Sequence, residues 1–286
     1  MVSSRRRVLV TGADGMLGSE VLRAFEGGSD VVGVDVADFD VRDRAATADA
    51  VRHLAPDAII NCAAYTDVDG AESQREAAFE VNATGAGSVA RAAATVGAYV
   101  VHMSTDYVFD GSLDRAYVES DEPHPLGVYG ESKLAGEIEV AASGAEFLIV
   151  RTAWLYGHNG GNFVETMLGL AALHDTLRVV DDQRGCPTNA GDLAAVLRDL
   201  ESRRPTGIVH ASNSGNCTWY GFAREILARA GLRDVKLVPV KTSEFERPAP
   251  RPARSVLSLA RLVDLLGWEP RPWEEALAEY LSERTP

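Results

Sequence analysis

The sequence has little cysteine and no long apolar run. These two absences argue against a protein held by disulfides or zinc and against one that spans a membrane. Its 286 residues contain three cysteines, Cys62, Cys186 and Cys217, whose odd number and wide spacing form neither a zinc pattern nor a disulfide framework. No uninterrupted apolar stretch approaches the roughly 20 residues that span a bilayer. The basic start, residues 5–7, leads directly into a predicted strand, so we expect no signal peptide. These features predict a cytoplasmic protein that makes no contact with a membrane.

Lysine is scarce as well, with Lys133, Lys236 and Lys241 among 28 basic residues. The net charge of −14 excludes a broad basic surface for nucleic acid. An anionic substrate would therefore need a local basic pocket. Acidic residues are numerous, but none of their spacings is typical of magnesium ligands, so we expect no metal site.

The order of elements predicts an α/β fold with a doubly wound parallel sheet of the Rossmann type. Short apolar runs alternate with helical patterns in the first half of the chain, which is the sequence form of βαβ units. The predicted strands are 7–10, 31–34, 58–61, 99–102 and 147–150, and the predicted helices are 16–25, 45–54, 75–96 and 132–142. Ligands of such sheets bind at the carboxyl ends of the strands.

After residue 151 the pattern becomes irregular, and nine of the 12 prolines fall in this part. We therefore expect a dinucleotide-binding domain over 1–153 and a smaller, irregular, mainly substrate-binding domain over 154–286. Within the latter, 187–211 contains a helical pattern at 192–200 and a strand pattern at 207–210. This segment is expected to return to the sheet of the first domain.

A glycine-rich junction follows the first predicted strand, with glycine at every third position from Gly12 to Gly18. At a strand-to-helix junction this spacing predicts a phosphate cradle, because glycine lets the backbone approach a pyrophosphate at the amino end of the helix. A glycine-rich turn without a ligand is the alternative. The expected cofactor contacts here are Gly12, Gly15, Met16, Leu17 and Gly18.

An acidic residue ends the second strand about twenty residues later, where a carboxylate can accept both ribose hydroxyls of an adenosine. This residue is Asp35, for which a solvated strand end is the alternative. Asp40 and Val41 could flank the adenine, or belong to an ordinary loop.

Two further segments supply candidate catalytic groups. The strand ending near Met103 delivers Thr105 and Asp106 to the carboxyl edge of the sheet, where a hydroxyl can bond a substrate carbonyl. Tyr129 and Lys133 are four apart and share one face of a helix. A nearby ammonium would lower the phenol pKa from about 10. Tyr129 can then act as general acid for ketone reduction.

These motifs together resemble the extended short-chain dehydrogenases, and within them the dTDP-4-dehydrorhamnose reductase family. The resemblance covers nearly the whole chain. Beyond the glycine loop it rests on the blocks PDAIINCAAYTDVDGAE, STDYVFDG, VYGESKLAGE, RTAWLYG, DDQRGCPT and RPARSVL. The chain departs from the family pattern at Gly70, Gly127, Cys186 and Asn189, which leaves the preference for sugar and base open.

The resemblance implies an NADH- or NADPH-dependent reduction of the 4-keto group of a dTDP-4-keto-6-deoxyhexose, with dTDP-4-dehydrorhamnose as the first expectation. It implies catalysis by Thr105, Tyr129 and Lys133. The implied cofactor contacts are Ala63, Ala64, Tyr65, Tyr129 and Lys133, and the implied substrate contacts are Thr105, Asp106, Trp154, Gln183, Pro187, Thr188 and Arg251. Trp154 could instead be a core aromatic, and Arg251 could form a surface ion pair.

Two other functions remain open at this point. One is a non-catalytic regulatory subunit with the same fold, against which the intact Thr105, Tyr129 and Lys133 set argues. The other is a different extended short-chain dehydrogenase, such as a sugar-nucleotide epimerase. The expected partner is a small nucleotide sugar, with a second copy of the chain in a homodimer as a further expectation and no nucleic acid.

Overall fold

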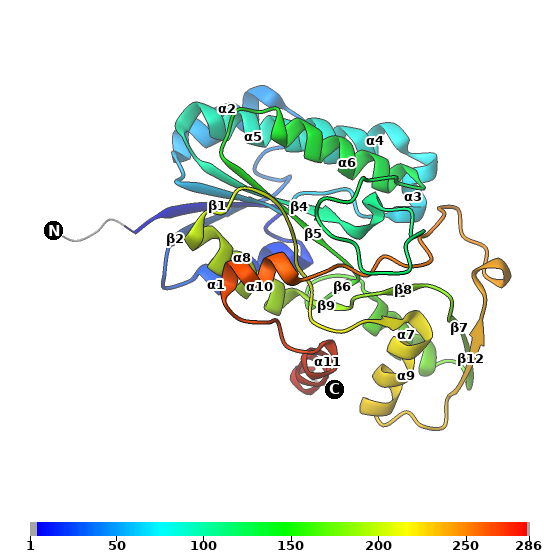
Figure 1. Cartoon of the computed structure of the whole chain (residues 1–286). Helices are drawn as coiled ribbons and strands as arrows, with labels where there is room; N and C mark the ends of the chain where they lie inside the picture. Colours follow the sequence, from blue (N-terminus) through cyan, green and yellow to red (C-terminus); the bar gives the residue numbers. More distant parts are fainter. Residues whose placement is uncertain (1–4, 285–286) are drawn as a thin grey trace.

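A computed structural model describes residues 5–284 and places a parallel β-sheet at the centre of an α/β fold (Figure 1). Its six strands lie in the order β10-β5-β4-β3-β1-β2, and each pairs in parallel with its neighbours. The strands are β1 (Arg7–Thr11), β2 (Asp30–Val34), β3 (Ala58–Asn61), β4 (Tyr99–Thr105), β5 (Phe147–Thr152) and β10 (Gly207–His210). The predicted doubly wound Rossmann fold is confirmed.

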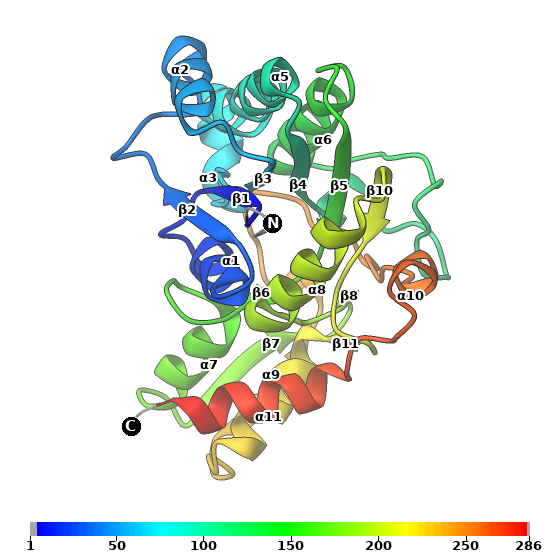
Figure 2. The ribbon, with the colours of Figure 1, turned by 90° about the vertical axis from the view of Figure 1, so that its left-hand side faces the viewer.

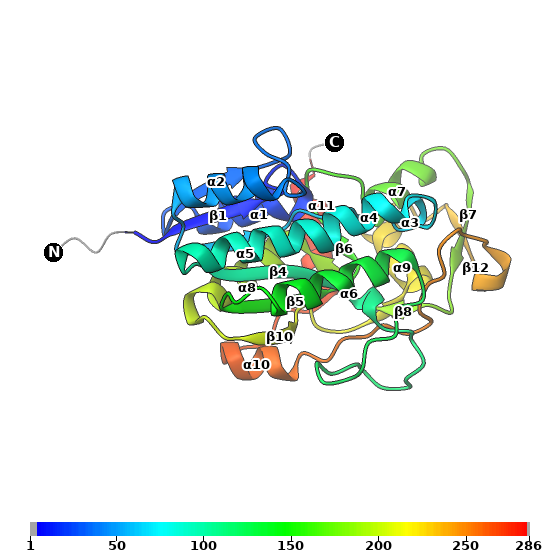
Figure 3. The same ribbon diagram turned by 90° about the horizontal axis from the view of Figure 1, so that it is seen from above.

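Helices cover both faces of this sheet (Figure 2). Val8 and Val10 of β1 face one layer of helices, and Leu9 between them faces the other, because successive strand residues point to opposite faces. The first layer contains α1 (Met16–Phe25), α8 (Ala190–Arg203) and α10 (Ala260–Leu266). The second contains α2 (Arg44–Leu54), α5 (Ala86–Val96) and α6 (Val128–Ala141), of which α5 and α6 lie side by side in Figure 3. Strands buried on both faces explain the continuous apolar runs of the sequence.

The predicted helix 75–96 is wrong as a single α-helix. The chain forms α4 (Arg75–Phe79), then a π-helical turn η1 (Glu80–Gly85), and only then α5. Within η1, Asn82 accepts a hydrogen bond from the Tyr65 amide at 2.9 Å and donates to the Tyr65 carbonyl at 3.1 Å. The wider π turn thus carries a side chain that fixes the loop after β3, a use of π turns that is common at functional sites.

The remaining elements form a smaller, irregular region below the sheet in Figures 1 and 2. They are β6 (Leu155–Tyr156), α7 (Phe163–Ala171), β7 (Thr176–Val180), β8 (Arg184–Gly185), β9 (Thr188–Asn189), β11 (Cys217–Thr218), α9 (Trp219–Arg229), β12 (Lys236–Val240), η3 (Thr242–Glu244) and α11 (Trp273–Glu283). Their own apolar cluster includes Phe222, Trp273 and Leu277. The short helices α3 (Val68–Ser73) and η2 (Asp106–Val108) complete the fold.

The segment 187–211 contributes α8, which packs on α1, and β10, which pairs with β5. Both elements therefore lie with the main sheet, while the domain boundary at residue 153 stays a prediction. Strand β1 has β2 on one side and β3 on the other, so the strand order changes direction beside β1. A crevice at the carboxyl ends of the strands is expected at such a point. Within residues 5–284, no helix is both long and apolar enough to cross a bilayer.

Candidate active site

A cavity of about 940 Å³ runs along the carboxyl ends of the strands. It brings together most of the residues that the sequence singled out, from both ends of the proposed cofactor site. Those that line it are Gly12, Gly15, Met16, Leu17, Gly18, Asp35, Asp40, Val41, Ala63, Ala64, Tyr65, Thr105, Asp106, Tyr129, Lys133 and Trp154. One continuous hollow thus joins the glycine loop to the candidate catalytic groups.

The glycine loop at one end of the cavity fits a dinucleotide. Gly12 has a φ of +67°, and a Cβ there would lie 2.7 Å from the Ala63 amide nitrogen. A Cβ on Gly18 would lie 2.0 Å from the Gly12 carbonyl oxygen. Helix α1 begins at Met16, and no side chain within the described residues caps its amino end. Its first amides and positive dipole end are therefore available to a phosphate.

Asp35 lies beside this loop and links it to β2. Its carboxylate accepts hydrogen bonds from the Asp14 amide at 3.0 Å and the Val36 amide at 2.7 Å. The Asp35 carboxylate is thereby fixed at the edge of the cavity, where a ribose would have to pass. The ribose contact of Asp35 stays a prediction.

Arg42 also lines the cavity, but other residues engage its charge. Its guanidinium donates to both carboxylate oxygens of Asp40, at 3.0 and 2.8 Å through Nε, and lies 3.4 Å from Glu80. Hydrogen bonding to Arg42 holds the pKa of Asp40 below its usual value. The Arg42 cation is therefore largely balanced by two carboxylates.

At the other end of the cavity, β4 and α6 bring the three candidate catalytic residues together. Thr105 is the last residue of β4, and Tyr129 lies in the first turn of α6, which begins four residues before the predicted start. The Thr105 hydroxyl donates to Asp106 at 3.2 Å and accepts from the Tyr107 amide at 3.2 Å. The Lys133 ammonium is buried and donates to the Met103 carbonyl at 2.7 Å.

The expected direction of the Tyr129 pKa is wrong. Burial raises the pKa of Tyr129 to about 12, and the hydroxyl of Thr105 only partly opposes that rise. Burial also lowers the pKa of Lys133 to about 8, although Glu137 acts in the opposite direction. The reason for the correction is desolvation, which penalises both charged forms and which residue spacing does not reveal. Tyr129 is therefore a protonated phenol at neutral pH, the form that a general acid needs.

Asp106 is a buried carboxyl beside these groups. It accepts hydrogen bonds from Thr105 and from the hydroxyl of Ser255 in the segment before α10. Burial raises the pKa of Asp106 to about 7, and its hydrogen bonds with Ser255 and Thr105 limit the rise. The RPARSVL block, which contains Ser255, thereby reaches the end of β4.

Trp154 forms part of the cavity wall and also packs against other side chains. Its ring stacks on that of Trp219, and a Cβ on Gly185 would lie 2.4 Å from it. Its φ of +47° is left-handed, a strained conformation for a large residue that surrounding contacts must hold. Trp154 thus combines the two alternatives that the sequence left open, because it packs on a neighbour and faces the cavity.

Four expected substrate contacts do not line the cavity, namely Gln183, Pro187, Thr188 and Arg251. Gln183 accepts from the Trp219 indole at 3.2 Å, and the Thr188 amide donates to the Trp154 carbonyl at 3.2 Å. Both residues therefore support the wall behind Trp154. Arg251 donates two hydrogen bonds of 2.9 Å to Asp69. The ion pair that was one alternative for Arg251 is present, while its role toward a diphosphate stays a prediction.

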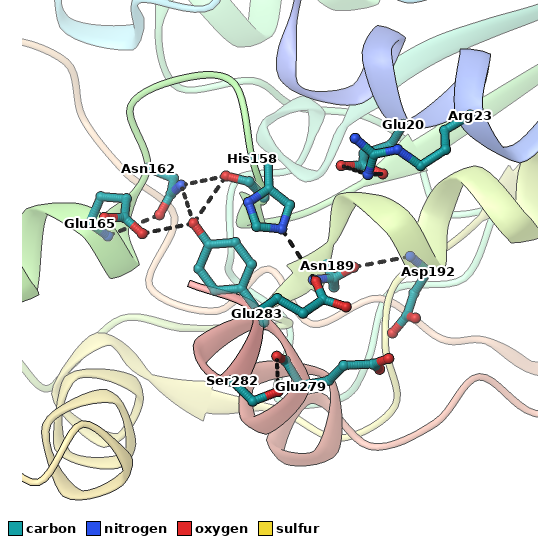
Figure 4. A network of polar contacts seen from close by, with 12 residues as sticks. Glu20, Arg23, His158, Asn162, Glu165, Asn189, Asp192, Glu279, Ser282 and Glu283 are labelled. Carbon is teal, nitrogen blue, oxygen red and sulfur yellow. Dashed lines mark hydrogen bonds and ion pairs between the residues drawn. The ribbon is translucent and has the colours of Figure 1, made fainter. Parts of the chain in front are cut away.

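Sequence reasoning missed the segment 157–161, whose Asn159, Gly160 and Gly161 line the cavity. Asn159 donates to Ser19 of α1 at 3.0 Å. The neighbouring His158 lies 3.3 Å from Glu283 of α11, and both are shown in Figure 4. The segment thus connects the glycine-loop helix to the last helix. The adjacent glycines were a usable signal, since a pair of glycines marks a loop.

The parallel sheet with its glycine loop and the cavity at its carboxyl edge define a dinucleotide-binding enzyme of the extended short-chain dehydrogenase class. The family described as RmlD substrate binding domain matches residues 6–285. The chain belongs to this family.

Named relatives agree along almost the full length of the chain. It is 45% identical over 290 residues to a dTDP-4-dehydrorhamnose reductase of Mycobacterium tuberculosis H37Rv, covering 99% of this chain and 94% of the relative. It is 43% identical over 280 residues to the spore coat polysaccharide biosynthesis protein SpsK of Bacillus subtilis, covering 98% of each. The structure of dTDP-4-dehydrorhamnose reductase from Bacillus anthracis in complex with NADP matches with a TM-score of 0.94 and 39% identity. The match covers 98% of this chain and 100% of that chain.

Proposed function

We propose that this chain is a dTDP-4-dehydrorhamnose reductase that reduces the 4-keto group of the nucleotide sugar with NADH or NADPH. The observation that carries the proposal is the single cavity that connects the glycine loop to Thr105, Tyr129 and Lys133. A cofactor held at the loop would extend to the catalytic residues along the same cavity. The full-length similarity to reductases of that name supports the choice of substrate.

A nicotinamide cofactor bound in the cavity would supply the hydride for the carbonyl carbon. Tyr129 holds a proton on its buried phenol and donates it to the ketone oxygen, so that an alcohol forms. Thr105, whose hydroxyl lies at the end of β4, can turn from Asp106 to donate a hydrogen bond to the same oxygen. The Lys133 ammonium provides positive charge near the phenol oxygen from which the proton leaves.

The glycine loop would hold the pyrophosphate of the cofactor, with Met16 and Leu17 at the helix start, and Asp35 would hold the adenosine ribose. Ala63, Ala64 and Tyr65 follow β3 and border the middle of the cavity, where Asn82 fixes the Tyr65 backbone. Trp154 forms the wall against which the sugar lies. Asp40 and Val41 would border the adenine.

The proposed reductase works in the cytoplasm, an assignment that its three free cysteines support. A homodimer is the proposed assembly, and sedimentation of the purified protein tests it. The nucleotide sugar is the proposed small-molecule partner.

The experiment that tests the proposed function is cofactor oxidation by the purified protein. Absorbance at the nicotinamide band should fall when dTDP-4-dehydrorhamnose is added with NADH or NADPH, and should not fall with a UDP-hexose. Conversion of a UDP-hexose without net cofactor oxidation would favour an epimerase. Cofactor binding without turnover of any 4-keto-6-deoxy sugar nucleotide would favour the regulatory alternative.

A further inference from the structure

A buried ion pair behind the catalytic residues has no part in the mechanism above. Arg151 of β5 donates to Glu137 of α6 through Nε at 2.8 Å and through Nη2 at 2.6 Å. Arg151 is 1% exposed and Glu137 is 4% exposed. Removing two charges from water costs about as much as their attraction returns, so stability alone is a weak reason for such a pair.

The Glu137 carboxylate also contacts the strand that ends at the catalytic hydroxyl. Ser104, which directly precedes Thr105 in β4, donates to Glu137 Oε1 at 2.5 Å. One carboxylate therefore connects α6 to both β4 and β5. Its orientation is fixed by three hydrogen bonds that leave little freedom for rotation.

Tyr129, Lys133 and Glu137 follow one another at intervals of four residues in α6. Residues at this spacing lie on one face of a helix, so the carboxylate is the next group along the face after the ammonium. We propose that Glu137 is a positioning residue of the reaction, the fixed counter-ion that keeps the Lys133 side chain charged beside Tyr129. The effect of Glu137 on the charge of Lys133 does not depend on the proposed function. Its effect on catalysis does.

The other groups that face Lys133 do not replace this counter-ion. Cys62, which follows β3, has its thiol pKa raised to about 12 by burial and is neutral at physiological pH. His102 of β4 has its pKa held well below the usual value by burial and by the Lys133 charge, so it too is neutral. Arg151 of β5 is a cation. Among these groups, Glu137 is the ionised one that favours the ammonium.

The ionisation of Lys133 can be measured without substrate or cofactor. The chain has three lysines, and Lys236 and Lys241 are exposed. With lysine labelled by ¹³C at the ε position, three NMR signals are expected, and Lys236→Arg and Lys241→Arg assign two of them. We expect the remaining signal to titrate near pH 8 in the wild type. In Glu137→Gln its midpoint should fall by about one pH unit or more, because an adjacent opposite charge is lost.

Glu139→Gln is the matched control. Glu139 is on the same helix and pairs with Arg91 at 2.7 Å, but 43% of its side chain is exposed. This variant removes a carboxylate and breaks an ion pair, and it should leave the Lys133 midpoint unchanged. An equal fall in both variants would overturn the proposal, as would an unmoved midpoint in Glu137→Gln.

Two further variants separate charge from packing. Glu137→Asp keeps the charge but cannot keep the same paired geometry, so it should lower the melting temperature while the Lys133 midpoint stays near the wild-type value. If Glu137→Gln fails to fold, Glu137→Gln/Arg151→Met also removes the buried Arg151 cation that would otherwise lose its partner, and Arg151→Met is its reference. Loss of the Arg151 cation should raise the Lys133 midpoint and loss of the Glu137 carboxylate should lower it, so the midpoint of the double variant should lie below that of Arg151→Met. Equal midpoints in these two variants would contradict the proposal.

In the active enzyme, Glu137→Gln should move the basic limb of kcat/KM to lower pH, and turnover should recover partly as the pH is lowered. Glu137→Asp should restore the wild-type limb. A structural role alone would reduce activity equally at all pH values. If the protein reduces no nucleotide sugar, the proposed function fails, while the NMR midpoints still decide the role of Glu137.

Discussion

The indole rings of Trp154 and Trp219 stack with their centroids 3.5 Å apart and 7° between their planes. The two residues are 65 positions apart, and Gly185 leaves the space in which Trp154 lies. Of these two residues, Trp154 lines the main cavity and Trp219 does not. In the proposed site, Trp219 would therefore act on the sugar through Trp154, by holding the Trp154 ring in place.

Trp154→Ala should raise the KM for the nucleotide sugar about tenfold and change kcat little, because a stacking wall supplies mainly uniform binding. Trp219→Ala should raise KM less. Steady-state kinetics and thermal melting of each variant test this. Trp268→Ala, which truncates a tryptophan that is 39% exposed, is the control and should change neither quantity. A Trp154→Ala protein that is largely unfolded, yet has an unchanged KM in its folded fraction, would assign the ring to the core alone.

The pH dependence should follow Lys133. Because the pKa of Lys133 is about 8, its ammonium is present below that pH and is lost as the pH rises through it. We expect kcat/KM to decline by about tenfold per unit well above pH 8, while Tyr129, with a pKa of about 12, remains protonated. In Lys133→Met, kcat/KM should no longer decline above pH 8, and both turnover and cofactor affinity should be lower than in the wild type. Full cofactor affinity in Lys133→Met would remove Lys133 from the expected cofactor contacts.

The cofactor preference should depend on Asp35. Its carboxylate, fixed by two backbone amides, would repel a 2′-phosphate at the ribose position, so NADH should be used well and NADPH accepted. Asp35→Ala should shift the ratio of kcat/KM toward NADPH. Asp40→Asn is a second test. It removes the carboxylate that binds Arg42, so the Arg42 cation can contact a 2′-phosphate and the ratio should shift in the same direction. An unmoved ratio in Asp35→Ala would mean that another residue sets the preference.

The sequence predicted the parts of the site that depend on local spacing. The Gly12 to Gly18 loop, the Thr105 strand end and the Tyr129–Lys133 pair lie where the βαβ order placed them, since each strand ends at the same edge. It did not predict contacts that form between distant elements. Gln183 and Thr188 support Trp154 from behind, and the pairing of Glu137 with Arg151 joins a helix to a strand.

Burial accounts for the largest error. The spacing of Tyr129 and Lys133 predicts their proximity, but the phenol pKa depends on how completely the surrounding chain excludes water. The π turn at Asn82 was missed for a related reason, since the hydrogen bonds that stabilise it come from Tyr65 and Ser132, on other segments.

The measurement that tests the central claim most directly is the product formed by the wild type and by Tyr129→Phe from dTDP-4-dehydrorhamnose. The wild type should form dTDP-L-rhamnose in a 1:1 ratio to the cofactor oxidised. Tyr129→Phe loses one hydroxyl, so it should fold and bind the cofactor normally while its turnover falls by about 10²- to 10⁴-fold. Turnover within a few-fold of the wild type would contradict the account, because Tyr129 would then not be the acid that completes the reduction.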